Sequence, residues 1–152
     1  MRCKDIMNTD VECVSAQTSV REAARRMRDT NVGFLPVCDE TMRAVGAVTD
    51  RDIAVRLVAE DHKATTPVEA IMSLQVIACR PEDDLSYARE LMAQNQKSRI
   101  MCINSEGRLE GVISLSDIAQ LDDSAGAATL RHVSGREARG NSWRAANDGS
   151  GW

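Results

Sequence analysis

The sequence contains one seven-residue pattern twice, and its residue types suit the binding of a phosphorylated ligand. The pattern is a glycine, two apolar residues, a threonine or serine, two variable residues and an aspartate. It reads Gly46-Ala-Val-Thr-Asp-Arg-Asp52 and, 65 positions later, Gly111-Val-Ile-Ser-Leu-Ser-Asp117. At a strand-to-helix junction, a hydroxyl group and the first helical N–H groups point to one place and favour an anion such as phosphate. An aspartate one turn later can accept two hydrogen bonds from a vicinal diol such as that of ribose.

Helix capping is the alternative explanation of the same residues. Thr49 or Ser114 would cap the helix that follows, and Asp52 or Asp117 would favour its positive end. A single copy of the pattern fits either explanation. Two copies that keep both residue types at the same spacing favour ligand binding, because capping alone does not require the later aspartate.

The sequence offers no recognisable set of residues for catalysis or for a structural metal site. The two histidines, His62 and His132, are isolated, and the five cysteines form no C-x-x-C pair. Four of the cysteines stand in apolar runs, which is typical of buried thiols in a reducing compartment, whereas Cys3 could be exposed. Negative charge at 82–84 is explained by the start of a helix. We therefore expect no enzymatic activity, no required cofactor and no metal.

Composition narrows the class of protein further. The net charge of −4 argues against a nucleic-acid partner, which usually requires a basic face. No apolar run approaches the roughly 18 residues that span a bilayer, and the first ten residues do not resemble a signal peptide. We expect a cytoplasmic protein without a membrane partner, with an aliphatic core because only 3% of the residues are aromatic.

The two patterns belong to an internal repeat that keeps its 65-residue register over about fifty residues. Each copy is expected to run strand, helix, strand, strand, helix: 11–14, 20–30, 34–38, 44–49 and 50–60, then 76–79, 84–95, 99–103, 109–114 and 115–122. Ser19 and Glu22 have the spacing of a capping box. In the second helix, Ile53, Leu57 and Val58 are expected to face the core.

This order predicts an α+β fold of two β-α-β-β-α repeats, 1–60 and 68–122, joined by a polar linker at 61–67. Residues 123–152 are expected to form an extension with a short helix and a disordered tail. A copy of fewer than sixty residues is at the low end for independent folding. We therefore expect the copies to pack sheet to sheet with pseudo-twofold symmetry and to leave two clefts at their seam.

With these motifs, the chain resembles a tandem pair of CBS domains. The resemblance rests on Asp5-Ile-Met7, Leu35-Pro-Val37 and Ala70-Ile-Met72 together with the two seven-residue patterns, and it covers about residues 3–122. It implies binding of AMP, ADP, ATP or S-adenosylmethionine in the clefts. It also implies side-by-side pairing of two modules into a homodimer, and regulation rather than catalysis.

The resemblance also implies how each cleft is composed. The Ser114/Asp117 cleft would add residues from the first repeat: Met7, Glu12, Val32 and Gly33. The Thr49/Asp52 cleft would add residues from the second: Met72, Ile77, Lys97 and Ser98. Arg51, Lys97 and Arg99 are candidate phosphate partners in the Thr49/Asp52 cleft, although ordinary solvated charge explains them equally well.

Two functions are open at this point. In the first, the protein is a regulatory adenine-nucleotide sensor without catalysis, which signals to an unidentified protein partner through altered packing. In the second, it is a ligand-free dimeric scaffold whose C-terminal extension recruits a partner.

Overall fold

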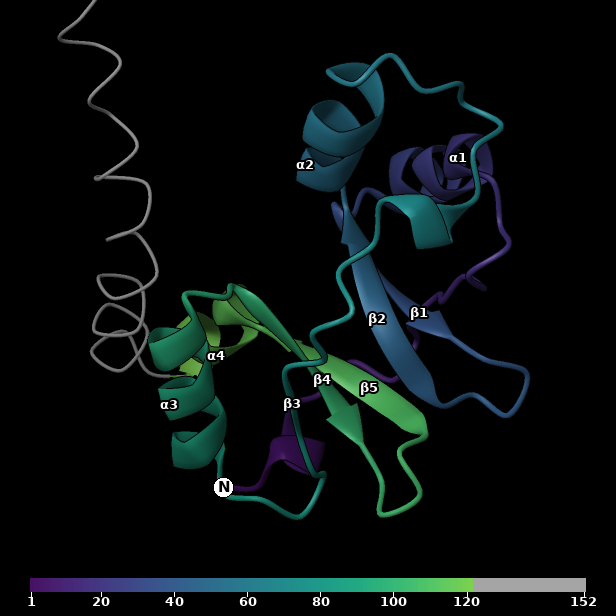
Figure 1. The fold of residues 1–152 in the computed structure, drawn as a ribbon. Helices are drawn as coiled ribbons and strands as arrows, with labels where there is room; N and C mark the ends of the chain where they lie inside the picture. Colours follow the sequence, from purple (N-terminus) through teal and green to yellow (C-terminus); the bar gives the residue numbers. More distant parts are fainter. Residues whose placement is uncertain (122–152) are drawn as a thin grey trace, which may run out of the picture.

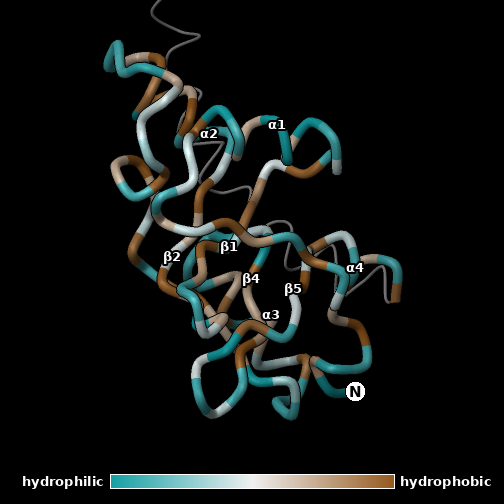
Figure 2. Tube along the Cα trace, turned by 90° about the vertical axis from the view of Figure 1, so that its right-hand side faces the viewer, coloured by the Kyte–Doolittle hydropathy of each residue, from teal (hydrophilic) through white to brown (hydrophobic). Residues whose placement is uncertain are grey.

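The computed structural model describes residues 1–121. Within this range the chain forms two similar units, one above the other in Figure 1, each with a small sheet covered by helices. The predicted extension, 123–152, lies outside the described residues. Figure 2 shows hydrophobic residues along the strands, whereas much of helix α1 and many connecting loops are hydrophilic.

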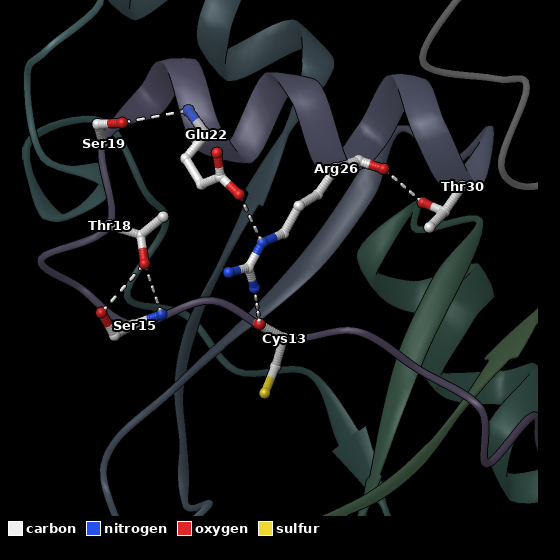
Figure 3. Close-up of polar contacts among 7 residues, drawn as sticks. All are labelled: Cys13, Ser15, Thr18, Ser19, Glu22, Arg26 and Thr30. Carbon is white, nitrogen blue, oxygen red and sulfur yellow. Dashed lines mark hydrogen bonds and ion pairs between the residues drawn. The ribbon is translucent and has the colours of Figure 1, made fainter.

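The first helix, α1 (Val20–Thr30), begins and ends as the sequence predicts. The Ser19 hydroxyl accepts a hydrogen bond from the Glu22 amide at 3.1 Å (Figure 3). The Glu22 carboxylate does not complete the expected capping box, because it pairs instead with Arg26, one turn later, at 3.4 Å. The helix ends where Asn31 adopts a left-handed conformation, with φ of 53°.

Strands β1 (Phe34–Cys38) and β2 (Ala44–Thr49) form an antiparallel pair at the predicted residues. The expected strand 11–14 contributes only a single parallel bridge, from Val14 to Val37. One residue earlier, the Cys13 carbonyl accepts a hydrogen bond from the Arg26 guanidinium at 2.9 Å (Figure 3). This side-chain contact joins Cys13 to α1, whereas its neighbour Val14 exchanges backbone hydrogen bonds of 3.0 and 2.9 Å with Pro36 and Cys38 of β1.

The second helical segment starts as α2 (Asp50–Asp52) and continues as a π-helical turn (Ile53–Val58). Leu57 is buried as expected, but Val58 is 65% exposed, so its predicted inward orientation is wrong. The wider π-helical turn changes the direction of each side chain relative to an α-helix, which explains the difference.

The second repeat has the same order of elements. It contains β3 (Ala78–Cys79), α3 (Leu85–Asn95), β4 (Arg99–Ile103), β5 (Leu109–Ser114) and α4 (Leu115–Leu121). The sheet order is β3-β4-β5, with β3 parallel and β5 antiparallel to β4. All but β3 lie within one residue of the predicted bounds, whereas β3 is two residues shorter than the expected strand 76–79.

The segment that leads into each repeat packs against the other repeat. A 3-10 turn at Cys3–Asp5 places Cys3 in the core of the second repeat, fully buried. A matching turn at Val68–Ala70 places Val68 and Ile71 in the core of the first repeat. Cys3, whose exposure the sequence left open, is therefore buried, and the two repeats are interlocked.

The seam between the repeats has the predicted pseudo-twofold symmetry. The Ala44 amide donates to the Gly107 carbonyl at 3.0 Å, and the Leu109 amide donates to the Met42 carbonyl at 2.9 Å. These two hydrogen bonds exchange under the 65-residue offset, because 42 corresponds to 107 and 44 to 109. The starts of β2 and β5 therefore meet about a local twofold axis.

Candidate functional site

The Thr49/Asp52 cleft is a cavity of about 510 Å³ between the two repeats. Seven of its eight predicted residues, counting the phosphate candidates, line it together: Thr49, Arg51, Asp52, Ile77, Lys97, Ser98 and Arg99. The eighth, Met72, does not line the cavity; it packs against the core of the first repeat. Residues from both repeats thus converge on one hollow, as the resemblance implies.

Thr49 and Asp52 form a reciprocal capping box. The Asp52 amide donates to the Thr49 hydroxyl at 3.1 Å, and the Thr49 amide donates to Asp52 Oδ2 at 2.9 Å. The second carboxylate oxygen, Oδ1, has no backbone donor and lies 3.8 Å from Nε of Arg56. Capping and ligand binding are therefore compatible, because the cap uses one oxygen and leaves the other toward the cleft cations.

The Ser114/Asp117 cleft repeats this geometry in a cavity of about 450 Å³. Asp117 Oδ2 accepts from the Ser114 amide at 2.8 Å and from its hydroxyl at 2.6 Å. Glu12 and Val32 line the same cavity. In both copies the backbone amide of the hydroxyl residue therefore donates to the same oxygen, Oδ2, of the motif aspartate.

Two residues expected in the Ser114/Asp117 cleft lie elsewhere. Gly33 lines the Thr49/Asp52 cleft, where its carbonyl accepts a hydrogen bond from the Asp50 amide at 3.0 Å. Met7 lies outside the cavity lining and against Gly111, where an added Cβ would be 3.0 Å from its side chain. Both assignments followed from the resemblance, which implies the segments that face each cleft but not the side of the seam to which each residue turns.

The glycine of each pattern allows a backbone strand from the other repeat to approach. A Cβ atom on Gly46 would overlap the Ser73 carbonyl oxygen, and one on Gly111 would lie 2.8 Å from the Asn8 carbonyl oxygen. Next to these glycines, Ala47 and Ser73 exchange two hydrogen bonds of 3.0 and 2.8 Å. Ser73 and Asn8, which are equivalent under the offset, thereby reach the two clefts. The glycine at the start of each repeated pattern was the sequence signal for this close approach of the two backbones.

The two clefts differ in charge. The basic residues that line the Thr49/Asp52 cleft outnumber its two carboxylates, Asp50 and Asp52; they are Arg51, Arg56, Lys97 and Arg99. The Ser114/Asp117 cleft is lined by three carboxylates, from Asp10, Glu12 and Asp117, and by one basic residue, Arg99. Sequence reasoning missed Arg56, which follows Asp52 by four residues, and Asp10, which lies between the predicted residues Met7 and Glu12. An anion is favoured in the Thr49/Asp52 cleft.

Three of the four buried cysteines, Cys3, Cys79 and Cys102, lie in the core of the second repeat, and the fourth, Cys38, ends β1. The sulfur atoms of Cys79 and Cys102 are 3.4 Å apart, and their hydrogen bond is the largest effect that raises the pKa of Cys79 to about 12. A thiol with such a pKa is protonated at neutral pH and is a poor nucleophile. Among residues 1–121 no cluster of three or more His, Cys, Asp or Glu side chains could hold a metal ion. No helix in this range is long and apolar enough to cross a membrane.

Comparison with known proteins agrees with the resemblance. The chain is 35% identical over 133 residues to the CBS domain-containing protein YhcV of Bacillus subtilis, covering 86% of this chain and 94% of that protein. It is 32% identical over 120 residues to hypoxic response protein 1 of Mycobacterium tuberculosis, covering 77% and 82%. It is also similar to the crystal structure of the CBS domain pair of protein MJ0100 in complex with 5′-methylthioadenosine and S-adenosyl-L-methionine. The TM-score is 0.74 at 25% identity, and the match covers 82% of this chain and 97% of that one.

The family model for the CBS domain matches this chain twice, over residues 3–59 and 68–123. These two matches coincide with the two repeats whose motifs line the clefts. The chain therefore belongs to the CBS-domain family and carries a tandem pair of CBS domains.

Proposed function

We propose that the protein is a regulatory sensor without catalytic activity, which binds an adenine nucleotide or S-adenosylmethionine in the clefts between its repeats. The observation that carries this proposal is the convergence of the motif and of residues from the opposite repeat on one cavity, most completely at Thr49 and Asp52. The MJ0100 pair, which binds two adenosine derivatives, supports the ligand class.

Each part of the Thr49/Asp52 cleft suits one part of a nucleotide. The Asp52 carboxylate accepts hydrogen bonds from the ribose diol through the oxygen that the cap leaves free. Lys97 and Arg51 lie on the same cavity and neutralise phosphate. Ile77 provides an apolar surface for the adenine ring.

Signalling follows from the origin of these residues. Thr49 and Asp52 belong to the first repeat, whereas Ile77 and Lys97 belong to the second. A ligand that contacts both favours the arrangement in which both sets reach it, so binding shifts the packing of the repeats. Such a shift in packing is transmitted to a molecule that contacts both repeats, either a separate protein partner or a second copy of this chain.

Thermal unfolding with AMP, ADP, ATP and S-adenosylmethionine tests the proposal. We expect at least one ligand to raise the melting temperature by several degrees, since a ligand that binds only the folded state at about 100 times its Kd stabilises it by about 2.7 kcal/mol. Absence of a shift with all four ligands at millimolar concentration would contradict the proposal.

The cap geometry dictates which variant of Asp52 is informative. Alanine would remove the capping bond as well as the ligand contact, whereas Asp52→Asn can keep an oxygen for the Thr49 amide and place a donor where the diol needs an acceptor. We expect Asp52→Asn to retain the melting temperature of the free protein and to lose the ligand-induced shift. Glu60→Gln, which removes an exposed carboxylate outside both cavities, is the matched control.

A ligand-free dimeric scaffold is the second candidate. It is favoured by a groove of about 340 Å³ in the first repeat, which is lined by the apolar residues Val20, Ala24, Ile53, Leu57 and Ala64 and by three arginines, Arg21, Arg25 and Arg28. Val58, on the same helical segment as Ile53 and Leu57, is 65% exposed. In this version, truncation after Asp122 abolishes capture of a partner and leaves the fold intact. Capture that survives truncation would contradict it.

A further inference from the structure

Arg99 occupies a position that no other charged residue among 1–121 shares. It is the first residue of β4, and it lines both the Thr49/Asp52 cavity and the Ser114/Asp117 cavity. Phe34, its equivalent under the 65-residue offset, also lines both. Arg99 and Phe34 therefore contribute to both clefts, and the symmetry of the pair is broken at this position by one cation.

The guanidinium of Arg99 is available to a ligand. The residue is half-buried, and within the described part of the chain its side chain makes no hydrogen bond and no ion pair. In contrast, the nearby Arg56 already donates to the Ile71 carbonyl at 3.2 Å and lies 3.8 Å from Asp52. A half-buried cation without a protein partner is a favourable site for phosphate, because screening by water is reduced there.

The two clefts depend on this cation to different extents. The Thr49/Asp52 cleft retains three other basic residues without it, whereas Arg99 is the single basic residue among those described that lines the Ser114/Asp117 cleft. One guanidinium carries one positive charge, so a phosphate bound to it in one cleft offsets most of that charge. A second phosphate in the other cleft then gains much less from the same side chain.

We infer that Arg99 couples the two clefts, so that a phosphate-bearing nucleotide in one weakens the binding of a second such nucleotide in the other. This inference rests on the proposed function. The Thr49/Asp52 cleft fills first and engages Arg99, and the Ser114/Asp117 cleft then faces a second anion with three carboxylates and no free cation. A nucleoside has no phosphate to bind Arg99, so it occupies the two clefts without this coupling. Coupling of this kind is reciprocal between the sites.

Calorimetric titration of the full chain with AMP and, separately, with adenosine tests the inference. For AMP we expect two binding events per chain whose Kd values differ by about tenfold or more, since a charge-assisted hydrogen bond contributes about 1.5–3 kcal/mol. For adenosine the two events should differ much less. Asp52→Asn and Asp117→Asn assign each event to its cleft.

Arg99→Gln is the decisive variant, with Arg51→Gln as its matched control because Arg51 lines only the Thr49/Asp52 cleft. We expect Arg99→Gln to make AMP binding in either cleft insensitive to occupancy of the other, measured by blocking one cleft with Asp52→Asn or Asp117→Asn. Arg51→Gln should weaken the first event and leave the coupling in place. Arg99→Lys keeps a positive charge at the same position of the strand, and we expect it to retain coupling. That result shows that the loss of coupling in Arg99→Gln is not a folding defect.

The outcomes separate the inference from the proposed function. Two equal and independent AMP sites, or coupling that persists in Arg99→Gln, would overturn the role of Arg99 and leave nucleotide binding intact. Equal coupling for adenosine and AMP would also overturn it, because phosphate would not be its cause. Binding of neither AMP nor adenosine would overturn the inference, and the proposed function itself would fall only if ADP, ATP and S-adenosylmethionine also fail to bind.

Discussion

The Gly46→Ala substitution tests whether the motif glycine exists for the close approach of the opposite repeat. A Cβ atom at this position would overlap the backbone carbonyl of Ser73, which cannot rotate away as a side chain could. Forcing an additional methyl group into a packed site costs about 1–3 kcal/mol. The shift also strains the two hydrogen bonds between Ala47 and Ser73, each with a net contribution of about 0.5–1.5 kcal/mol. We therefore expect a loss of about 2–6 kcal/mol in the free energy of unfolding.

Two other glycines provide graded controls for this prediction. At Gly111 the nearest atom, the Asn8 carbonyl oxygen, is 2.8 Å from the added Cβ, and the other close atoms belong to the flexible Met7 side chain, so the loss should be smaller. At Gly33 the close atoms are the carboxylate of Asp50, an exposed residue whose side chain can rotate into solvent, so the loss should be less than about 0.5 kcal/mol.

Urea unfolding followed by circular dichroism measures the loss of stability for each glycine variant. The values can be compared if the dependence of the unfolding free energy on urea concentration is unchanged. Because Ser73 lines the Thr49/Asp52 cleft, Gly46→Ala should also reduce the thermal shift given by a bound nucleotide. If Gly33→Ala is as costly as Gly46→Ala, or if Gly46→Ala is neutral, then backbone approach is not the reason for the glycine.

Two further predictions concern local contacts of the fold. Ser19→Ala removes the hydroxyl that accepts from the Glu22 amide, and we expect a loss of about 1 kcal/mol in urea unfolding, with the exposed turn residue Ser105→Ala close to neutral. Lys4 and Arg2 lower the pKa of Glu82 from 4.5, first through hydrogen bonds and then through their charges. A lowered pKa in the folded state gives a stabilisation that is present above the ordinary value and is lost as the pH falls through the folded value. The stability difference between the wild type and Glu82→Gln should therefore be largest near neutral pH and vanish in acid; a difference that is constant with pH would contradict the assignment.

Local patterns in the sequence predicted most of the elements. Helix α1, strands β1, β2, β4 and β5, and helix α3 lie at or within one residue of their expected bounds, because each has a clear periodicity and a defined end, such as the cap at Ser19. The expected strand 11–14 is reduced to a bridge at Val14, and the adjacent Cys13 carbonyl is bound by Arg26, thirteen residues away. Such a contact has no signature within the strand itself.

What the sequence determined by itself is the presence of two similar repeats and the chemistry of their motifs. The fixed offset and the hydroxyl–aspartate spacing are local properties, and the structure places Thr49 with Asp52 and Ser114 with Asp117 in the same hydrogen-bonded arrangement. The tertiary structure alone decided which residues complete each cleft. In the packed pair of repeats Gly33 lines one cavity and Arg99 lines both, and these placements depend on how the two repeats meet at the seam rather than on any periodicity along the chain.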